Sequence, residues 1–256
     1  MTEDSRTSFR DSVRAGKPLI GTFVKTASYQ VLEVLGTTGL DFVVIDAEHA
    51  PYDRNQLDVA LLAARASRLP ALVRLQTSGA SSVLDALDMG ATGLLVPHAR
   101  SAADVRAVLA LARYRDGVRG FSNSPRAGGY GTIGMMPHID VADRDTSLIC
   151  QVEDREAVDN IDAIAMVPAV DCLFIRRADL AVSYRVFDVA HPVVTDAVAR
   201  ICSACKRVGK AVGIFVATAA DIPRYRELGA TLFVVGSDQS LLRAQASSIA
   251  NEFRGQ

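Results

Sequence analysis

The sequence predicts an α/β fold, a (β/α)8 TIM barrel, on three observations. Short β-branched runs alternate with longer segments of helical periodicity, a pattern typical of repeated strand–helix units around a parallel sheet. Eight such runs can be identified, and 256 residues is a length that suits a barrel of eight units. An open doubly wound sheet is the alternative, but the sequence has neither a GxGxxG motif after the first run nor a GxxxxGK(S/T) phosphate loop.

The expected strands are short apolar runs rich in β-branched residues, as in strands buried on both faces of a parallel sheet. In chain order they are Ile20–Lys25, Phe42–Asp46, Ala71–Leu75, Gly93–Pro97, Leu148–Glu153, Cys172–Ile175, Ala211–Val216 and Leu232–Gly236.

The expected helices have apolar residues three or four positions apart, so that one face of each can pack on the sheet. They are Tyr29–Leu35, Arg54–Ser67, Ser82–Met89, Ala102–Tyr114, Arg155–Met166, Thr195–Val208, Ile222–Leu228 and Ser240–Phe253. The last of these can pack on its own barrel or on a neighbouring subunit, and the sequence leaves both open.

The stretch Arg115–Asp145 interrupts this alternation. It holds six glycines and two prolines, so we expect a long Gly-rich loop that is either functional or a flexible surface excursion. No repeat, low-complexity tract or interdomain linker is visible, and residues 1–256 are therefore expected to form a single barrel domain.

The balance of charge argues against binding to nucleic acid or to acidic membranes. The chain has 28 Lys and Arg residues against 29 Asp and Glu, a net charge of −1, so it lacks the basic excess that such partners attract. No stretch approaches about 18 consecutive apolar residues, and the polar N-terminal segment lacks the apolar core of a signal peptide. We expect a cytoplasmic protein without a membrane segment.

The four cysteines, Cys150, Cys172, Cys202 and Cys205, are expected to be buried free thiols. Cys202 and Cys205 have the spacing of a redox motif or half a zinc site. No second Cys or His pair follows them, and they fall on an expected helix, so the structural interpretation is favoured.

Polar residues at the carboxyl ends of barrel strands meet at one mouth, where active sites of this fold are almost always built. Acids, arginines, one histidine and one glutamine follow strands two, three, five and six here. They are Asp46, Glu48, His49, Arg74, Gln151, Glu153, Arg176, Arg177 and Asp179. A histidine beside two carboxylates at a strand end is often only a structural contact, but the whole set indicates a catalytic site.

Glu153 and Asp179 are candidate ligands for a divalent cation. They are one strand–helix unit apart, which predicts backbone positions roughly 5 Å apart on neighbouring strands. Oxygen ligands alone suit Mg²⁺ or Mn²⁺ better than a thiolate-bound zinc. The alternative is a pair of solvated acids at the rim.

Seven segments, taken together, resemble a known family. They are Val44–Pro51, Val73–Arg74, Leu84–Ala91, Gly93–Pro97, Gln151–Glu153, Ala178–Leu180 and Val234–Asp238. In this order they look like the HpcH/HpaI family of class II, metal-dependent pyruvate aldolases, which includes 4-hydroxy-2-oxoheptanedioate and 2-dehydro-3-deoxyglucarate aldolases. The resemblance implies a barrel of the phosphoenolpyruvate/pyruvate-domain type and a homo-oligomer, in this family a hexamer.

The resemblance also assigns the metal and substrate residues. It implies that Glu153 and Asp179 ligate the metal, Mg²⁺ or Mn²⁺ first, with Co²⁺ or Zn²⁺ as further options. Gln151 and Ala178 would lie beside the metal and the bound 2-oxo acid. Arg74 would face the ketone oxygen, where a fixed cation stabilises the charge that develops on an enolate.

The proton-transfer residues come from the same resemblance. His49 matches the general base, acting through a water, and Asp88 matches the acid that pairs with it and raises its basicity. Without the resemblance, Asp88 is equally well an exposed acid on the helix Ser82–Met89. Asp46 and Glu48 would support the water network.

The implied reaction is the reversible aldol cleavage of a 4-hydroxy-2-oxo acid to pyruvate and an aldehyde through a metal-stabilised enolate. Two alternatives stay open, a decarboxylase or other lyase acting on another 2-oxo acid, and a non-catalytic barrel that binds a small molecule. A Schiff-base lysine is not required, and Lys25 is expected only to line the rim.

One position departs from the family pattern, because Arg176-Arg177 stands where the family usually has Gly-Pro. The two arginines can recognise an extra anionic group, point outward, or mark a homologue without aldolase activity, and the sequence leaves all three open. Arg126, in the Gly-rich loop, is a candidate contact for the aldehyde's distal carboxylate, with a solvated loop cation as the alternative.

Overall fold

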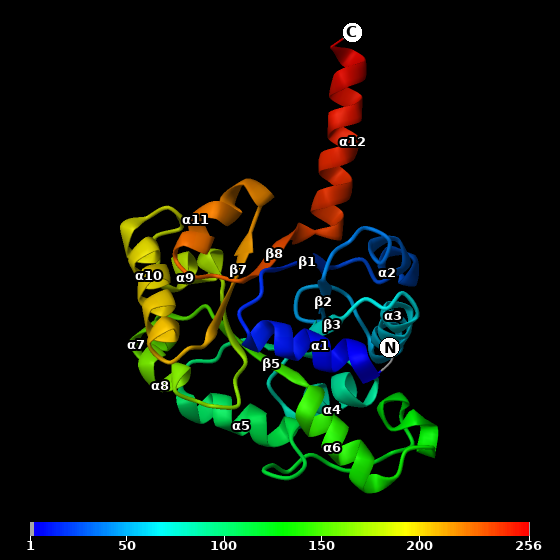
Figure 1. Ribbon diagram of the computed structural model, residues 1–256. Coiled ribbons are helices and arrows are strands. Elements are labelled where there is room, and N and C mark those ends of the chain that lie inside the picture. The colour runs from blue at the N-terminus through cyan, green and yellow to red at the C-terminus, as the bar shows by residue number, and fades with distance from the viewer. Residues whose placement is uncertain (1–2, 256) are drawn as a thin grey trace.

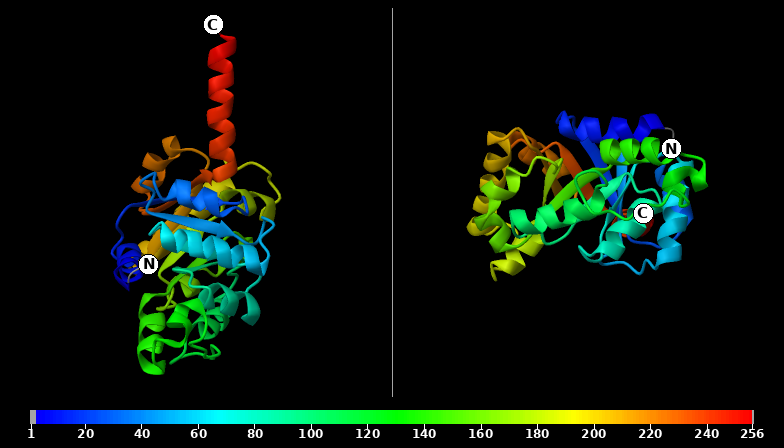
Figure 2. Two further views of the ribbon diagram at one scale, coloured as in Figure 1. Left: turned by 90° about the vertical axis from the view of Figure 1, so that its right-hand side faces the viewer. Right: turned by 90° about the horizontal axis from the view of Figure 1, so that it is seen from below.

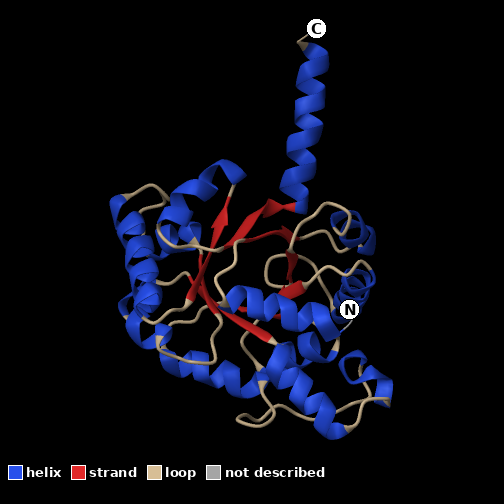
Figure 3. Ribbon diagram, viewed as in Figure 1, coloured by secondary structure: helices blue, strands red, loops and turns tan. Residues whose placement is uncertain are grey.

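The computed structural model describes residues 3–255 and shows eight parallel strands closed into a barrel (Figures 1 and 3). Each strand pairs with its neighbours in chain order, and β8 closes the ring by pairing with β1. The strands are β1 (Leu19–Val24), β2 (Phe42–Asp46), β3 (Ala71–Arg74), β4 (Gly93–Val96), β5 (Ser147–Val152), β6 (Cys172–Ile175), β7 (Ala211–Val216) and β8 (Leu232–Ser237). The predicted TIM barrel is confirmed, with every strand end within one residue of expectation.

Helices follow the strands, and all of them except the last, α12, lie around the outside of the barrel (Figure 1). They are α2 (Tyr29–Leu35), α3 (Arg54–Ala66), α4 (Ala80–Asp88), α5 (Ala102–Ala112), α7 (Arg155–Asp159), α8 (Ile161–Ala165), α9 (Arg177–Ser183), α10 (Pro192–Arg207), α11 (Ile222–Glu227) and α12 (Asp238–Arg254), with a short 3₁₀ turn, η2 (Ala219–Asp221), before α11. The expected helix Arg155–Met166 is broken in two at Asn160, which has φ −95° and ψ 11°.

The core has two layers because each strand is buried on both faces. One layer fills the barrel interior with side chains such as Phe42, Val44 and Phe174, and the other lies between the strands and the surrounding helices. The interior is so tight that a Cβ at Gly21 would lie 2.5 Å from the Phe42 carbonyl oxygen. Only glycine fits at this position.

The helix α1 (Glu3–Arg14), which the sequence analysis did not predict, covers the amino-terminal end of the barrel. Its Phe9 and Val13 join the interior layer, and the Phe9 and Phe42 rings are 5.4 Å apart. Arg10 donates to buried Asp171, just before β6, at 3.0 Å. The strand ends at this side are therefore sealed, and the opposite end carries the site.

The stretch Arg115–Asp145 is not the structureless loop that was expected. It contains a 3₁₀ segment, η1 (Arg126–Gly131), and the helix α6 (Met135–Asp145). Helix α6 begins after Gly134 and carries Pro137 in its first turn, where the missing N–H costs no hydrogen bond. The glycines that suggested a loop thus separate two ordered segments.

Helix α12 leaves the carboxyl end of β8 and projects away from the barrel (Figures 1 and 2). Its first residue, Asp238, is buried and accepts the backbone N–H groups of Lys25 and Thr26. Beyond that anchor its apolar side chains Leu242 and Phe253 are 73% and 79% exposed. It does not pack along its own barrel. Of the two arrangements that the sequence left open, packing on its own barrel is therefore wrong, and packing on a neighbouring subunit stays a prediction. Among residues 3–255, no helix is both long and apolar enough to cross a membrane.

Candidate active site

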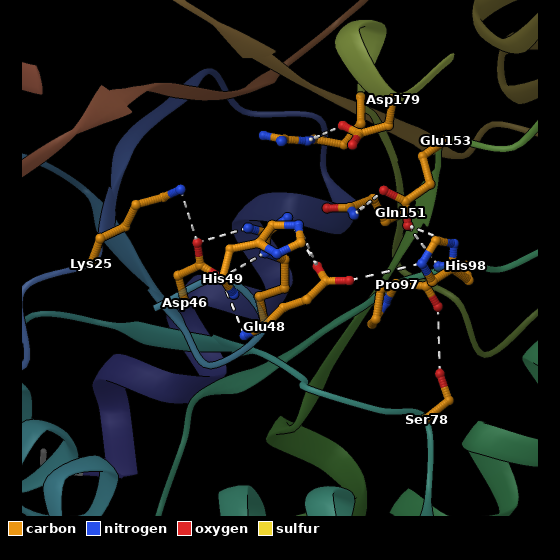
Figure 4. A network of polar contacts seen from close by, with 12 residues as sticks. Lys25, Asp46, Glu48, His49, Ser78, Pro97, His98, Gln151, Glu153 and Asp179 are labelled. Carbon is orange, nitrogen blue, oxygen red and sulfur yellow. Dashed lines mark hydrogen bonds and ion pairs between the residues drawn. The ribbon is translucent and has the colours of Figure 1, made fainter. Parts of the chain in front are cut away.

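The carboxyl ends of the strands bring most of the predicted site residues to one mouth (Figure 4). Asp46 is the last residue of β2 and Arg74 the last of β3, while Gln151 lies near the end of β5 and Glu153 just after it. Their backbones are fixed by the ladder, in which Asp46 pairs with Arg74 and Val152 with Ile175. The barrel therefore places these side chains on rigid elements.

A buried ion pair forms the floor of the mouth. Arg74 donates from Nε to Asp46 Oδ1 at 3.0 Å and from a terminal nitrogen to Oδ2 at 2.7 Å, and the two side chains are 1% and 0% exposed. Its other terminal nitrogen lies 3.1 Å from Glu48 Oε2. The guanidinium also sits 4.8 Å over the Phe23 ring. Arg74 is thus held in one orientation by two carboxylates and an aromatic ring.

Asp46 orders the rim as well as the floor. Its Oδ1 accepts the backbone N–H of His49 at 3.0 Å, and its Oδ2 lies 3.3 Å from Lys25 Nζ. Burial raises the pKa of Asp46, but the hydrogen bond and charge of Arg74, the N–H of His49 and the charge of Lys25 together lower it by more, so its pKa lies below the ordinary value. The carboxylate stays charged and fixes the loop that carries His49.

Glu153 is oriented by two donors on the opposite wall. Its Oε1 accepts the backbone N–H of His98 at 2.8 Å, and its Oε2 accepts the amide N–H of Gln151 at 2.5 Å. Burial raises the pKa of Glu153, and the nearby charges of Asp179 and Glu48 add to that effect. A cation close to Glu153 would relieve this cost of burying its negative charge.

Gln151 has one polar atom without a partner. The residue is fully buried, its amide nitrogen serves Glu153, and its Oε1 accepts no hydrogen bond in the described chain. Figure 4 shows that this oxygen points away from Glu153 into the mouth. A buried acceptor left unsatisfied is costly unless a ligand or cation reaches it. Together with the Glu153 carboxylate, it provides the oxygen donors that a hard divalent cation prefers.

Asp179 does not sit at the end of β6, where it was expected. Residues Arg177–Ser183 form a helix, α9, that the sequence analysis missed, and Asp179 lies in its first turn. Arg176 Nε donates to Asp179 Oδ2 at 3.0 Å. The second predicted metal ligand therefore already has a cationic partner.

The double arginine separates into two environments. Arg176 is 14% exposed at its side chain and lies over the rings of Phe215, at 4.9 Å, and Phe23, at 5.5 Å. Arg177 instead lies 4.8 Å over the Tyr225 ring of α11. Ala178 follows in α9. Arg176 thus lies at the mouth, over two rings of the barrel strands, whereas Arg177 packs against α11.

His98 is the residue that the sequence analysis missed. It follows β4, its Nδ1 lies 3.0 Å from Asp154 Oδ2 and 3.4 Å from Glu153 Oε1, and its Nε2 lies 3.8 Å from Glu48 Oε1. Burial lowers the pKa of His98, but hydrogen bonding to Asp154 and the surrounding carboxylates raise it by more. The signal was its place directly after an expected strand, at the same rim as the other polar residues.

His49 lies at the rim with 55% of its side chain exposed, and its Nε2 is 3.8 Å from Glu48 Oε2. The expected partner Asp88 is elsewhere. It ends α4 and accepts from buried Arg119 at 2.9 Å, and within residues 3–255 neither a hydrogen bond nor an ion pair joins it to His49. A His49–Asp88 pair is thus not formed inside one chain.

Arg126 also lies away from the mouth. Its guanidinium donates to the Asp58 carboxylate at 2.9 Å and to the Met89 carbonyl at 2.8 Å. Asp58, Asp88 and Arg126 line a separate cavity of about 350 Å³ among α3, α4 and η1. Within the described residues, Arg126 therefore makes no contact with the mouth of its own chain.

The cysteines are all free and buried, as predicted. Burial raises the pKa of Cys202 to about 11 and that of Cys205 to about 12. Thiols held this far from ionisation are poor nucleophiles and poor metal ligands at neutral pH.

Comparisons with known proteins agree with this geometry. The family profile described as HpcH/HpaI aldolase/citrate lyase matches residues 19–244. The chain is 34% identical over 248 residues to the 5-keto-4-deoxy-D-glucarate aldolase of Klebsiella pneumoniae, covering 96% of each chain. It is 35% identical to a structurally characterised aldolase/citrate lyase family protein from Burkholderia cenocepacia J2315, with a TM-score of 0.92 over 97% of this chain and 99% of that one. A protein named citrate synthase is 26% identical, with a TM-score of 0.86 over 96% of this chain and 97% of that one.

Proposed function

Because the chain belongs to the HpcH/HpaI aldolase/citrate lyase family, we propose that it cleaves a 4-hydroxy-2-oxo acid reversibly to pyruvate and an aldehyde. The observation that supports this most directly is the Arg74 guanidinium, buried at the same barrel mouth that holds the Gln151–Glu153 pair. A fixed cation at this place stabilises the oxyanion that forms as a carbon–carbon bond next to a ketone breaks.

Arg74 retains donors for a substrate. Guanidinium has five N–H groups; two of them are donated to Asp46, and Glu48 lies 3.1 Å from a terminal nitrogen without forming a hydrogen bond. The three remaining N–H groups are available for the ketone or carboxylate oxygen of a 2-oxo acid. Because Asp46 and Glu48 hold the group in place, it needs no reorientation when the charge develops.

His49 is the proposed base for the C4 hydroxyl proton. Its ring is exposed at the rim, where a water or an aldehyde hydroxyl can reach it, and Asp46 fixes its backbone. Glu48 lies between His49, His98 and Arg74, so it can accept a proton relayed along the rim. When the hydroxyl proton is removed, the C4 oxygen forms the aldehyde carbonyl as C3–C4 breaks. The electron pair of that bond forms an enolate whose negative charge develops on the ketone oxygen near Arg74. Return of a proton to C3 then gives pyruvate.

A divalent cation, Mg²⁺ or Mn²⁺ with Co²⁺ and Zn²⁺ as options, would be held by the Glu153 carboxylate and Gln151 Oε1, with Asp179 as a further ligand. When bound, it would supply a second positive charge beside the carboxylate and ketone of the substrate. The unsatisfied Oε1 of buried Gln151 supports this assignment.

The test is proton exchange at the methyl group of pyruvate, which reports enolate formation without any aldehyde. The protein is incubated with pyruvate and Mg²⁺, Mn²⁺ or Co²⁺ in D₂O, and loss of the methyl signal is followed by NMR. Exchange is expected, and Arg74→Lys should slow it by at least about tenfold because lysine cannot reproduce the forked geometry. No exchange with any of the three cations would refute the enolate mechanism.

A second candidate is a reaction on a different 2-oxo acid, such as decarboxylation of oxaloacetate, because buried Arg74 would equally stabilise the enolate that this reaction forms. The two functions share the enolate and differ in the bond that breaks. Release of CO₂ from oxaloacetate at a higher kcat/KM than pyruvate release from 5-keto-4-deoxy-D-glucarate would favour the second.

The proposed active form is a homo-oligomer that binds small molecules only.

A further inference from the structure

We propose that Arg176 is a built-in counter-ion that occupies Asp179, so that a divalent cation binds through Glu153 and Gln151 and gains Asp179 only when the guanidinium leaves. This deepens the proposed function and rests on its metal site. The inference comes from this chain's own departure, Arg176-Arg177, and from where the structure places each of the two side chains.

Arg176 is held at Asp179 by several contacts at once. Its Nε donates to Asp179 Oδ2 at 3.0 Å, its guanidinium lies over Phe215 at 4.9 Å and Phe23 at 5.5 Å, and its side chain is 14% exposed. Flat stacking of guanidinium on aromatic rings is stronger where water is excluded. The side chain is therefore a packed part of the mouth and not a solvated arginine that happens to approach an acid.

The two carboxylates among the proposed metal ligands differ in what holds them. Glu153 is oriented by two neutral donors, the backbone N–H of His98 and the amide of Gln151, and its ion-pair partner is the His98 ring, with Nδ1 3.4 Å from Oε1, and not a guanidinium. Asp179 is held by a full positive charge. Within the described residues a divalent cation at Glu153 meets no arginine, but at Asp179 it must displace a guanidinium that is always charged or accept its repulsion at short range.

Arg177 provides a matched comparison in the adjacent position. Its guanidinium lies over Tyr225, and the described chain gives it no ion pair with Asp179. Removing its charge changes the net charge of the chain by the same amount as removing that of Arg176. It does not free Asp179, and this difference separates a specific counter-ion from a general effect of charge.

The experiment titrates Mn²⁺ alone into the protein and measures free Mn²⁺ by electron paramagnetic resonance, so no turnover is involved. We expect Arg176→Gln to tighten Mn²⁺ binding at least about tenfold, because a like charge a few ångströms from the cation is removed. Arg177→Gln should change the affinity by less than about threefold. Circular dichroism and thermal unfolding confirm that each variant folds.

A double-mutant cycle then tests whether Asp179 is the residue released. In the parent chain, Asp179→Asn should change Mn²⁺ affinity by less than about threefold, whereas in the Arg176→Gln background it should weaken binding about tenfold or more. Glu153→Gln should weaken binding in both backgrounds. The proposal is overturned if Asp179→Asn costs the same in both backgrounds, or if Arg176→Gln leaves the affinity unchanged. The proposed function is judged separately by the methyl exchange of pyruvate, which can persist in either case.

Discussion

The buried ion pair between Arg74 and Asp46 gives the sharpest quantitative prediction. Asp46→Asn keeps the shape of the side chain but removes the carboxylate that accepts two hydrogen bonds from a guanidinium only 1% exposed, and leaves Glu48, 3.1 Å from a terminal nitrogen, as the remaining negative charge. Loss of one partner from a buried ion pair costs about 3–5 kcal/mol. For a chain of this size each kcal/mol lowers the melting temperature by roughly 2–4 °C, so a fall of roughly 6–20 °C is expected.

The pH dependence follows from the sign of the shift. The pKa of Asp46 in the folded protein lies below its ordinary value, because Arg74, the N–H of His49 and Lys25 together outweigh the effect of burial. The stabilisation is therefore complete above the ordinary carboxyl value of about 3.9 and is lost as the pH falls below it, through the folded pKa. Asp46→Asn should have a lower free energy of unfolding at neutral pH and a shallower loss of stability below about pH 4.

Urea unfolding at pH 7 and across the acid range measures both effects. Asp159→Asn is the matched control, since Asp159 is 60% exposed and lies 3.9 Å from an arginine that is 69% exposed. Such a surface pair is worth about 0–1 kcal/mol. If Asp46→Asn destabilises the protein no more than Asp159→Asn, the conclusion that the buried Arg74–Asp46 ion pair stabilises the fold is wrong.

Three further predictions test other parts of the site and the fold. His49→Ala should lower kcat for aldol cleavage by about 10²–10⁴ with normal folding, measured as pyruvate release, and full activity would remove it as the base. His98 has φ 53°, a backbone conformation that glycine adopts more easily than alanine. In urea unfolding, His98→Ala should therefore have a free energy of unfolding about 1 kcal/mol lower than His98→Gly. The reverse order would mean that the backbone there is free to relax. Gly21→Ala places a Cβ 2.5 Å from the Phe42 carbonyl oxygen and should cost about 1–3 kcal/mol in thermal unfolding, whereas Gly39→Ala, where a Cβ meets nothing within 4 Å, should show only the strain of its positive φ.

The sequence located those elements whose successive residues are all buried, because such elements appear as continuous apolar runs. All eight strands are buried on both faces, so each appears as a continuous apolar run and could be located within a residue. The site residues at strand ends could be found for the same reason, because the end of a strand fixes where the next side chains go. Asp46, Arg74, Gln151 and Glu153 all lie where their strands predicted.

The sequence was uninformative where a long-range partner decides the outcome. Nothing in the segment near Asp88 indicates Arg119, 31 residues away, as the group that holds its carboxylate. The backbone of His98 adopts φ 53°, which no local pattern predicts for a histidine. Helix α9 begins within the double arginine itself, and the polar run concealed a first turn that displaces Asp179 from the strand end.

Phe23 is a core residue that couples the effects of mutations at two positions of the site. Its ring is 1% exposed and lies against the guanidinium groups of both Arg74 and Arg176. Two residues with different proposed tasks therefore share one supporting surface, and a change in either alters what the ring offers the other. Effects of mutations at these three positions should be non-additive, so the routes by which this barrel can acquire a new substrate depend on the order in which the three positions change.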